Sequence, residues 1–316
     1  LVSGNIGPLE VAYSSAANQI NNNLTVTYNA TGLISIGAGG GTATLAATRT
    51  ISVAGFGASG CGNLTLARLT QAGATAQNIS LGGNDTATLT LGPASNFGGA
   101  LTITTPSIIF NSSSFQAVTV TKTGSAVDNS RGGNTFNGVM TVNNQGGDVA
   151  MGTNAADAGD TWNASAVFNN TGGNRIRIGE DNAGNVFQAN ATFNNTSATD
   201  IQSRIQISRF GTASVTFNGT TTFTNNAPGG DIHISYEAGS STTFNGPLII
   251  NSNAGVTNVE NWIGNVGDVT LNGSVTISSS DRVAISQGSG LATMSAGNTI
   301  NIGGGGFTGS ELAIRN

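Results

Sequence analysis

The chain has 316 residues, enough for one large domain or two ordinary ones, and a hydrophobic content of 37% that can build a core. Charged residues make up only 8%, and glycine, asparagine, threonine and serine take their place. Ten basic residues face fifteen acidic ones and Lys122 is the only lysine, so we expect no nucleic-acid partner. The single Cys61 and single His233 exclude an intrachain disulfide and a multi-histidine metal site. No apolar run approaches the ~20 residues of a membrane helix, so no membrane span is expected in this segment.

The first 96 residues are rich in predicted β-strands. Alternating apolar and polar residues occur at 23–36, 49–55 and 86–92, between glycine-rich turns. Their register is left open, so residues 1–96 can be shorter coils of a solenoid, a cap or a small β domain. Residues 97–316 form the predicted solenoid region, which starts with "FGGALTITT" from Phe97 and "FQAVTV" from Phe115.

From Phe136 onward the sequence repeats about every 26 residues, as in "FNGTTTFTNN" from Phe217 and "FNGPLIINSN" from Phe244. A self-similar period of this length is typical of solenoids, propellers and other arrays. Each segment opens on a large apolar anchor, and a second apolar residue follows six positions later. The anchors are Phe136, Trp162, Phe187, Phe217, Phe244, Leu271 and Met294. The second residues are Val142, Phe168, Phe193, Phe223, Ile250, Ile277 and Ile300.

A further short alternating segment follows most of these strands, after an Asn/Gly/Ser turn. These segments are "DVAM" 148–151, "RIRI" 175–178, "RIQI" 204–207, "DIHI" 231–234 and "RVAI" 282–285. Two or three strands in 26 residues are too few for a propeller blade of ~40–45 residues but fit one coil of a parallel β-helix. The sequence therefore predicts an all-β fold, a parallel β-helix (β-solenoid) with coils of about 26 residues. Anchors and their partners then point inward and stack on their equivalents ~4.8 Å away.

Amide side chains recur next to the anchors and are predicted to form hydrogen-bonded ladders between coils. The glycine of the frequent Asn-Gly pair is expected to supply the positive φ of a sharp corner. The ladder one residue after the anchor comprises Asn137, Asn163, Gln188, Asn218, Asn245 and Asn272. A second column, seven residues after the anchor, comprises Asn143, Asn169, Asn194, Thr224, Asn251, Ser278 and Asn301.

Threonines recur on the outward side of the same predicted strands. Two coils interrupt this column with Val167 and Ile249. Ranked threonines on a flat face raise ice binding as one alternative function, although threonine is also favoured on half-exposed strands in general. The threonines of the column are Thr141, Thr192, Thr222, Thr276 and Thr299.

Five acidic residues near the predicted turns are the candidates for chemistry. Two carboxylates roughly 5–10 Å apart could serve a glycosidase, so a secreted carbohydrate-active β-helix enzyme is the rival function. Solvated turn residues are the preferred interpretation, and no catalytic residue is assigned. The acids are Asp157, Asp160, Glu180, Asp181 and Asp200. The first four are also weak calcium candidates, because calcium takes carboxylate oxygens; no other cofactor is expected.

The remaining polar residues of interest are interpreted as structural. His233 in "DIHIS" is predicted on the outer face, exposed to solvent, and no triad motif surrounds it. Cys61 has no basic neighbour in sequence to lower its pKa and is predicted to be inert. The arginines alternate with isoleucines and are predicted to face solvent. They are Arg175, Arg177, Arg204 and Arg209.

Segments such as "TFNGTTTFTNNAPGGDIHIS", almost without lysine or cysteine, resemble the β-strand-repeat proteins of bacterial surfaces. This group includes filamentous-haemagglutinin-like exoproteins, autotransporter passengers and the very large adhesins of gliding bacteria. The resemblance covers about residues 97–316. It implies an extracellular or cell-surface protein that is adhesive or forms filaments, with surface glycans or a host surface among its partners. The last coil carries no evident cap, so we also expect neighbouring repeats, or chains joined end to end.

Overall fold

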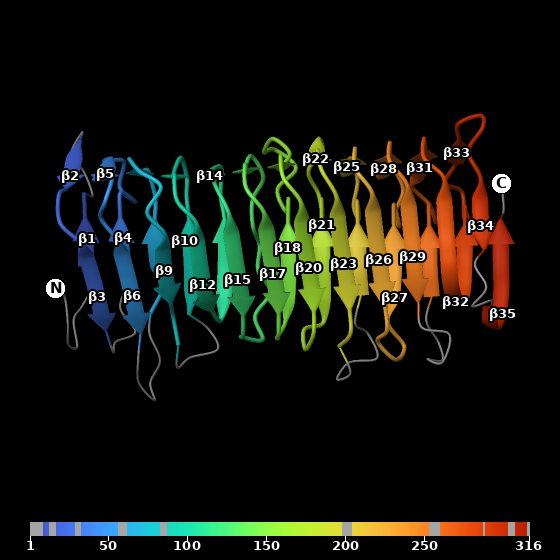
Figure 1. The fold of residues 1–316 in the computed structure, drawn as a ribbon, viewed down its shortest axis with the longest axis horizontal. Coiled ribbons are helices and arrows are strands. Elements are labelled where there is room, and N and C mark those ends of the chain that lie inside the picture. The colour runs from blue at the N-terminus through green and yellow to red at the C-terminus, as the bar shows by residue number, and fades with distance from the viewer. Residues whose placement is uncertain are drawn as a thin grey trace.

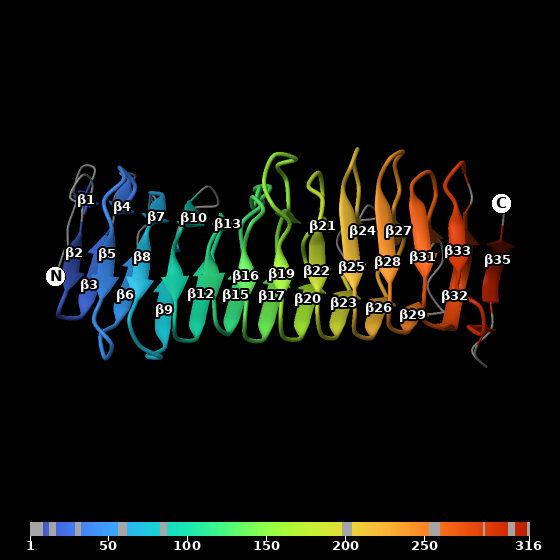
Figure 2. The ribbon, with the colours of Figure 1, turned by 90° about the horizontal axis from the view of Figure 1, so that it is seen from above.

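The protein is a parallel β-solenoid, as the sequence predicts (Figures 1 and 2). All regular elements of the described residues are strands, and the strand pairings among them are parallel, as in the pairing of β1 (Leu9–Val11) with β4 (Ile34–Ile36). The coils follow one another along a single axis, so that each strand lies beside its equivalents in the coils before and after it. The computed structural model describes residues 9–12, 17–28, 33–55, 62–82, 87–197, 204–252, 260–286, 288–302 and 307–314.

Each coil contributes short strands to three faces, which we name the anchor face, the threonine face and the charged face. The anchor face is one sheet of twelve strands that carries the anchor residues. It comprises β2 (Asn18–Ile20), β5 (Ala43–Leu45), β8 (Leu69–Gln71), β11 (Asn96–Phe97), β14 (Ser114–Phe115), β16 (Thr135–Phe136), β19 (Thr161–Trp162), β22 (Asn185–Phe187), β25 (Ser214–Phe217), β28 (Ser241–Phe244), β31 (Asp268–Leu271) and β33 (Ala292–Met294). Strands from residues 18–71 therefore pair into the same sheet as the later repeats.

The threonine face follows the anchor face in each coil and presents the row of long arrows in Figure 1. It comprises β3 (Leu24–Tyr28), β6 (Ile51–Gly55), β9 (Gln77–Ser80), β12 (Leu101–Thr105), β15 (Val118–Lys122), β17 (Met140–Asn144), β20 (Ala166–Asn170), β23 (Ala191–Asn195), β26 (Thr221–Asn225), β29 (Leu248–Ser252), the first part of β32 (Val275–Ile285) and β34 (Ile300–Ile302). Its inward residues join the core.

The charged face completes the coil and consists of two stretches. The first is β1, β4, β7 (Leu64–Leu66), β10 (Thr88–Leu91) and β13 (Ser107–Phe110). The second is β18 (Asp148–Met151), β21 (Arg175–Ile178), β24 (Arg204–Ile207), β27 (Asp231–Ile234), β30 (Glu260–Ile263), the second part of β32 and β35 (Phe307–Ile314).

The gap between these two stretches is closed by side chains. Residues 127 and 130 make only isolated bridges to β18. The carboxylate of Asp128 accepts the backbone N–H of Ile108 at 3.1 Å, and the hydroxyl of Ser130 accepts that of Phe110 at 3.0 Å. These oxygens replace the backbone carbonyls of a missing strand, so the N–H groups of β13 keep partners although the sheet is interrupted.

The core is a continuous stack of rings along the solenoid axis. Phe217 lies between Phe187 and Phe244, with ring centroids 4.8 and 5.0 Å apart. A second column runs beside it, where Phe193 stacks on Phe223 at 4.9 Å and meets Phe217 edge to face at 6.1 Å. Such stacked and edge-to-face pairs add ~0.5–1.5 kcal/mol each to the burial of the rings. All these rings are fully buried.

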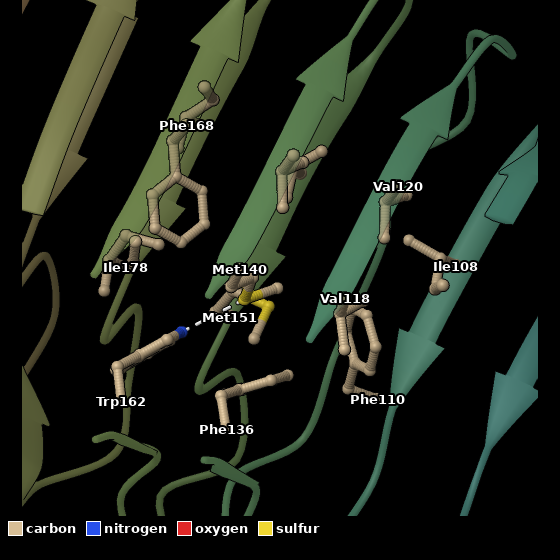
Figure 3. Packing of buried hydrophobic residues seen from close by; sticks show 14 of the residues in the cluster. Ile108, Phe110, Val118, Val120, Phe136, Met140, Met151, Trp162, Phe168 and Ile178 are labelled. Atoms are coloured by element: carbon tan, nitrogen blue, oxygen red, sulfur yellow. Dashed lines mark hydrogen bonds between the residues drawn. The ribbon is translucent and has the colours of Figure 1, made fainter. Parts of the chain in front are cut away.

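Every residue of the predicted core stack lies inside the solenoid. The first column runs through Phe136, Trp162, Phe187, Phe217, Phe244 and Leu271, and the second through Val142, Phe168, Phe193, Phe223, Ile250 and Ile277. Figure 3 shows Trp162 pointing into this interior, where its indole N–H donates to the sulfur of Met140 at 3.1 Å. The only polar atom of this ring therefore has a partner in the core.

The register departs from the sequence prediction in the last coil. Met294 pairs with Leu271 as expected, but Ile300 pairs with Val275 instead of Ile277. Two more residues therefore turn the corner here, which places Ile302 opposite Ile277 and Asn301 in the threonine column. The predicted places of Thr299, Ile300 and Asn301 are wrong for this reason. A similar shift after Ile250 pairs Asn251 with Ser279, so Ser278 leaves the predicted amide column.

The glycine of the Asn-Gly pair has a different role from the one predicted. Gly246 and Gly273 do not have a positive φ. A Cβ on Gly246 would lie 2.4 Å from the carbonyl oxygen of Gly219, and a Cβ on Gly273 only 2.3 Å from that of Gly246. Glycine stands at this corner because successive backbones approach too closely for a side chain. Positive φ occurs instead where the charged face ends, for example at Ser208 and Ser235.

We expect Phe217→Ala to lower the free energy of unfolding by about 3–5 kcal/mol, because it removes a ring from the middle of the stack. The matched control is Phe210→Ala, which removes a half-buried ring outside the core and should cost far less. Urea denaturation of both variants measures the difference. Equal losses would contradict the stacking described here.

Candidate functional site

An exposed amide ladder runs along the corner that follows the anchor face. Asn163 donates to Asn137 at 2.9 Å, and further along Asn218 donates to Gln188 at 2.7 Å. The hydrogen bonds continue from Asn245 to Asn218 at 2.7 Å and from Asn272 to Asn245 at 2.8 Å. Each amide thus contacts its equivalent in the preceding coil, which makes this ladder a structural element of the solenoid.

A second, fully buried amide ladder was missed by the sequence analysis. The side chain of Asn144 donates to that of Asn170, Asn170 to Asn195 and Asn195 to Asn225, each at 3.0 Å. All four residues have no solvent exposure. The signal was the asparagine that ends each strand in "VNN", "FNN" and "TFTN", eight residues after the anchor, where the side chain turns inward. The residue before it forms the predicted column, in which Asn194 and Asn169 also hydrogen-bond, at 2.8 Å.

The acidic residues proposed for calcium or for catalysis do not come together. Asp157 forms an ion pair with Arg131 at 2.8 Å, whereas Glu180 pairs with Arg177 and, at 3.3 Å, with Arg209. The hydrogen bond from Arg131 lowers the pKa of Asp157. Asp181 is partly exposed, and Asp200 lies outside the described residues. Among the residues that the structure describes, no three His, Cys, Asp or Glu side chains gather as metal ligands would.

Asp160 contradicts the expectation of a solvated turn residue, since it has no solvent exposure. One carboxylate oxygen accepts the backbone N–H and the side-chain amide of Asn134, both at 2.9 Å. The other oxygen has no hydrogen-bond partner. Burial outweighs the two hydrogen bonds and raises the pKa of Asp160 to about 7. Glu180 is also buried, with 8% exposure, because its arginine partners lie over it.

The charged face carries many of the ionisable side chains of the described chain. Arg204 pairs with Asp231 at 2.9 Å, and Arg282 pairs with Glu260 at 2.9 Å. Arg177 also contacts Asp148. The prediction that the arginines are solvated is wrong in degree. All four arginines are only partly exposed, and Arg177, Arg204 and Arg209 are each paired with an acid.

An aromatic group forms the centre of this face, and we call His233, Tyr236 and Trp262 the His233 cluster. The His233 ring stacks on Tyr236 at 4.4 Å and on Trp262 at 4.9 Å, with all three planes nearly parallel. The prediction of an exposed histidine is wrong, because these rings cover it and leave 3% exposure. Burial, reinforced by the charges of Arg204, Arg209 and Arg175, lowers the pKa of His233 to about 3. The imidazole is therefore neutral near neutral pH.

Several polar atoms of this cluster have no hydrogen-bond partner. They include both ring nitrogens of His233 and the indole nitrogen of Trp262. The carboxylate of Asp231 lies 3.6 Å from the nearer imidazole nitrogen, beyond hydrogen-bond distance. Burial, opposed by Arg204 and reinforced by Glu260, raises the pKa of Asp231 to about 6. The cluster thus combines aromatic rings, paired charges and unsatisfied donors and acceptors in one place.

Two further predictions concern other parts of the molecule. Cys61 lies outside the described residues. No helix in the described part of the chain is long and apolar enough to cross a membrane.

None of the protein-family models, curated proteins or solved structures compared with the chain matches it.

We expect Asp160→Asn to change how stability depends on pH. The pKa of Asp160 is about 7 in the folded protein and ~3.9 in an unfolded chain, so its protonation stabilises the fold below pH ~4. This contribution is lost as pH rises through about 7. The variant should be close to wild type at pH ~4 and more stable by about 1–3 kcal/mol at pH ~8, as measured by urea denaturation.

Asp157→Asn is the control for this prediction. Its pKa is lowered by Arg131, so it contributes stability above the unfolded pKa that is lost as pH falls. The control should therefore show no gain at high pH. A constant difference between Asp160→Asn and wild type across this range would contradict the raised pKa.

Proposed function

We propose that the chain is a segment of an extracellular bacterial stalk or filament, a rigid β-solenoid that carries adhesive contacts away from the cell. The observation that carries this proposal is the unbroken core, in which rings stack coil after coil from Phe97 to Phe244. Twelve strands at ~4.8 Å make a rod of about 55–60 Å. Further coils of the same kind would lengthen it linearly, because each coil contacts only its neighbours.

The surface chemistry supports an extended stalk. Most outward side chains are short, as on β26, where Thr222 and Thr224 face outward. Ladders of amides hold adjacent coils together through uncharged hydrogen bonds, which salt screens far less than ion pairs. The resemblance of the repeats to surface adhesins also supports a stalk. Weak contacts repeated along such a rod would gain avidity through multivalency.

The rival function, a secreted carbohydrate-active enzyme, has less support. A glycosidase needs two free carboxylates roughly 5–10 Å apart. Asp157 and Glu180 are held by arginines, and Asp160 is buried in hydrogen bonds to Asn134. Of the predicted acids that the structure describes, this leaves only Asp181, so no such pair is found among them.

Immunogold electron microscopy of intact source cells tests the stalk, with an antibody raised against residues 136–316. We expect gold on fibres that project from the cell surface. Gold confined to the cell interior, or only to free protein in the medium, would contradict the proposal. Pre-immune serum supplies the control for non-specific labelling.

Ice binding is a second candidate function, and the threonine face favours it. The outward positions of this face carry no charged side chain, and threonine occupies eleven of them across the twelve strands. Neighbouring strands lie ~4.8 Å apart and alternate residues ~6.7 Å apart, which places these threonines on a regular lattice that asparagines, Val167 and Ile249 interrupt. The threonines are Thr25, Thr27, Thr102, Thr104, Thr119, Thr121, Thr141, Thr192, Thr222, Thr224 and Thr276.

This candidate predicts that the purified chain slows ice recrystallisation and that Thr222→Tyr weakens the effect, because a bulky ring breaks the lattice. Thr243→Tyr is the matched control, since Thr243 faces outward on the anchor face, away from the threonine face. Recrystallisation at the rate of a buffer with an inert protein would contradict ice binding, as would equal effects of the two variants.

A further inference from the structure

Aromatic rings that meet the surface in the described structure are those of the His233 cluster and Phe210. Phe210, Tyr236 and Trp262 are each partly exposed. Every other phenylalanine or tryptophan whose side chain is described lies buried in the core. Elsewhere the outward positions carry mainly threonine, asparagine, serine and glycine. Large amphipathic rings at a surface are enriched where proteins bind partners. This group of exposed aromatic rings is therefore a candidate binding site.

We propose that the His233 cluster is a binding site for a neutral glycan, whose sugar rings stack on the exposed parts of Trp262 and Tyr236. The two aromatic rings are held with nearly parallel planes, 16° apart, by the buried His233 ring. His233 and Trp262 occupy paired positions on adjacent strands β27 and β30. The sheet therefore fixes Trp262, and ring stacking on His233 and Trp262 holds Tyr236, two residues after β27, before any ligand binds, which reduces the entropic cost of binding.

Unsatisfied polar atoms give an independent reason for a ligand at this place. Both nitrogens of the buried His233 ring lack a hydrogen-bond partner, and so does the indole nitrogen of Trp262. The side-chain oxygen of Gln206, which pairs with His233 in the strand register, is also buried without a partner. An unsatisfied buried polar group costs ~1–3 kcal/mol, so such groups are rare in native proteins. Sugar hydroxyls supply the matching donors and acceptors, and they reach these buried atoms when the covering side chains move aside on binding.

The ion pairs beside the cluster fit a neutral ligand, and Arg209 and Arg175 add positive charge near His233. The ion pairs of Arg204 with Asp231 and of Arg282 with Glu260 lie in one column of the charged face, two residues before the column of His233 and Trp262. Each pair holds both donors and acceptors for hydroxyl groups, and the two pairs carry no net charge. An anionic ligand would meet two carboxylates, and a cationic ligand two guanidinium groups. Stacking rings with a few convergent polar groups is the usual composition of a small-molecule site.

The role of this site in adhesion rests on the proposed function. A stalk would present one such site in every copy of the segment. The binding itself does not depend on where the protein is located. It is measured on the purified chain, so failure of binding and failure of surface labelling are distinct results.

Tryptophan fluorescence offers a direct readout of binding. The chain has two tryptophans, and Trp162 is buried in the core, where a surface ligand cannot contact it. We would titrate the chain with neutral oligosaccharides built from glucose, xylose, mannose and N-acetylglucosamine. We expect at least one of them to change the emission saturably, through Trp262. The apparent affinity should be nearly unchanged by added salt, because the ligand is uncharged.

Two variants locate the site, with binding followed by calorimetry where Trp262 is removed. Trp262→Ala should weaken binding at least tenfold, and Tyr236→Ala should weaken it as well. Thr243→Ala on the anchor face should bind as wild type does. Unchanged urea denaturation of Trp262→Ala would show that the loss is not one of folding. If the variant is destabilised, Trp262→Phe should retain partial binding.

The proposal is overturned if no neutral oligosaccharide binds at millimolar concentration, or if binding survives Trp262→Ala. It is also overturned if only charged ligands, such as uronic-acid oligosaccharides or phosphopeptides, bind with a strong dependence on salt.

Discussion

The parallel backbone pairing between successive coils is the constraint on which the rest of the structure depends. Each strand hydrogen-bonds to its equivalent in the next coil, and most strand pairs keep one register throughout. A side chain therefore lies directly over the equivalent side chain of the preceding coil, ~4.8 Å away. Every column must consist of groups that tolerate one another at that distance. Rings stack on rings in the core, and amides donate to amides at the corners.

The same constraint explains the charged face. Like charges in neighbouring coils repel, so a column of ionisable residues is most stable where acids and bases alternate. Arg204 and Asp231 satisfy this rule as an ion pair. Asp231 and Glu260 break the alternation, because these two acids occupy paired positions in adjacent coils. The pKa of Asp231 accordingly rises to about 6, mainly through burial and further through Glu260.

Ring stacking between adjacent coils occurs both in the core and in the proposed binding site. In the core, stacking of Phe187 on Phe217 holds coils together, and both rings are fully buried. On the charged face, stacking of His233 on Trp262 leaves one ring buried and the other partly exposed. A solenoid can therefore acquire a binding surface by placing aromatic residues at outward positions of two adjacent coils. Neither the core nor the register has to change.

By itself, the sequence determined the fold class, the period and the inward columns, because apolar anchors such as Phe217 and Phe244 repeat in phase with the coil. The register of residues 1–96 could not be predicted, because the anchor positions there carry no aromatic residue. Leu45 and Gln71, for example, occupy paired positions on the anchor face. Only the tertiary structure decided which polar groups are buried, since burial depends on neighbours 25–30 residues away in the chain. Thus alternation correctly turned His233 outward, but the rings of Tyr236 and Trp262, brought together by the coil, removed it from water.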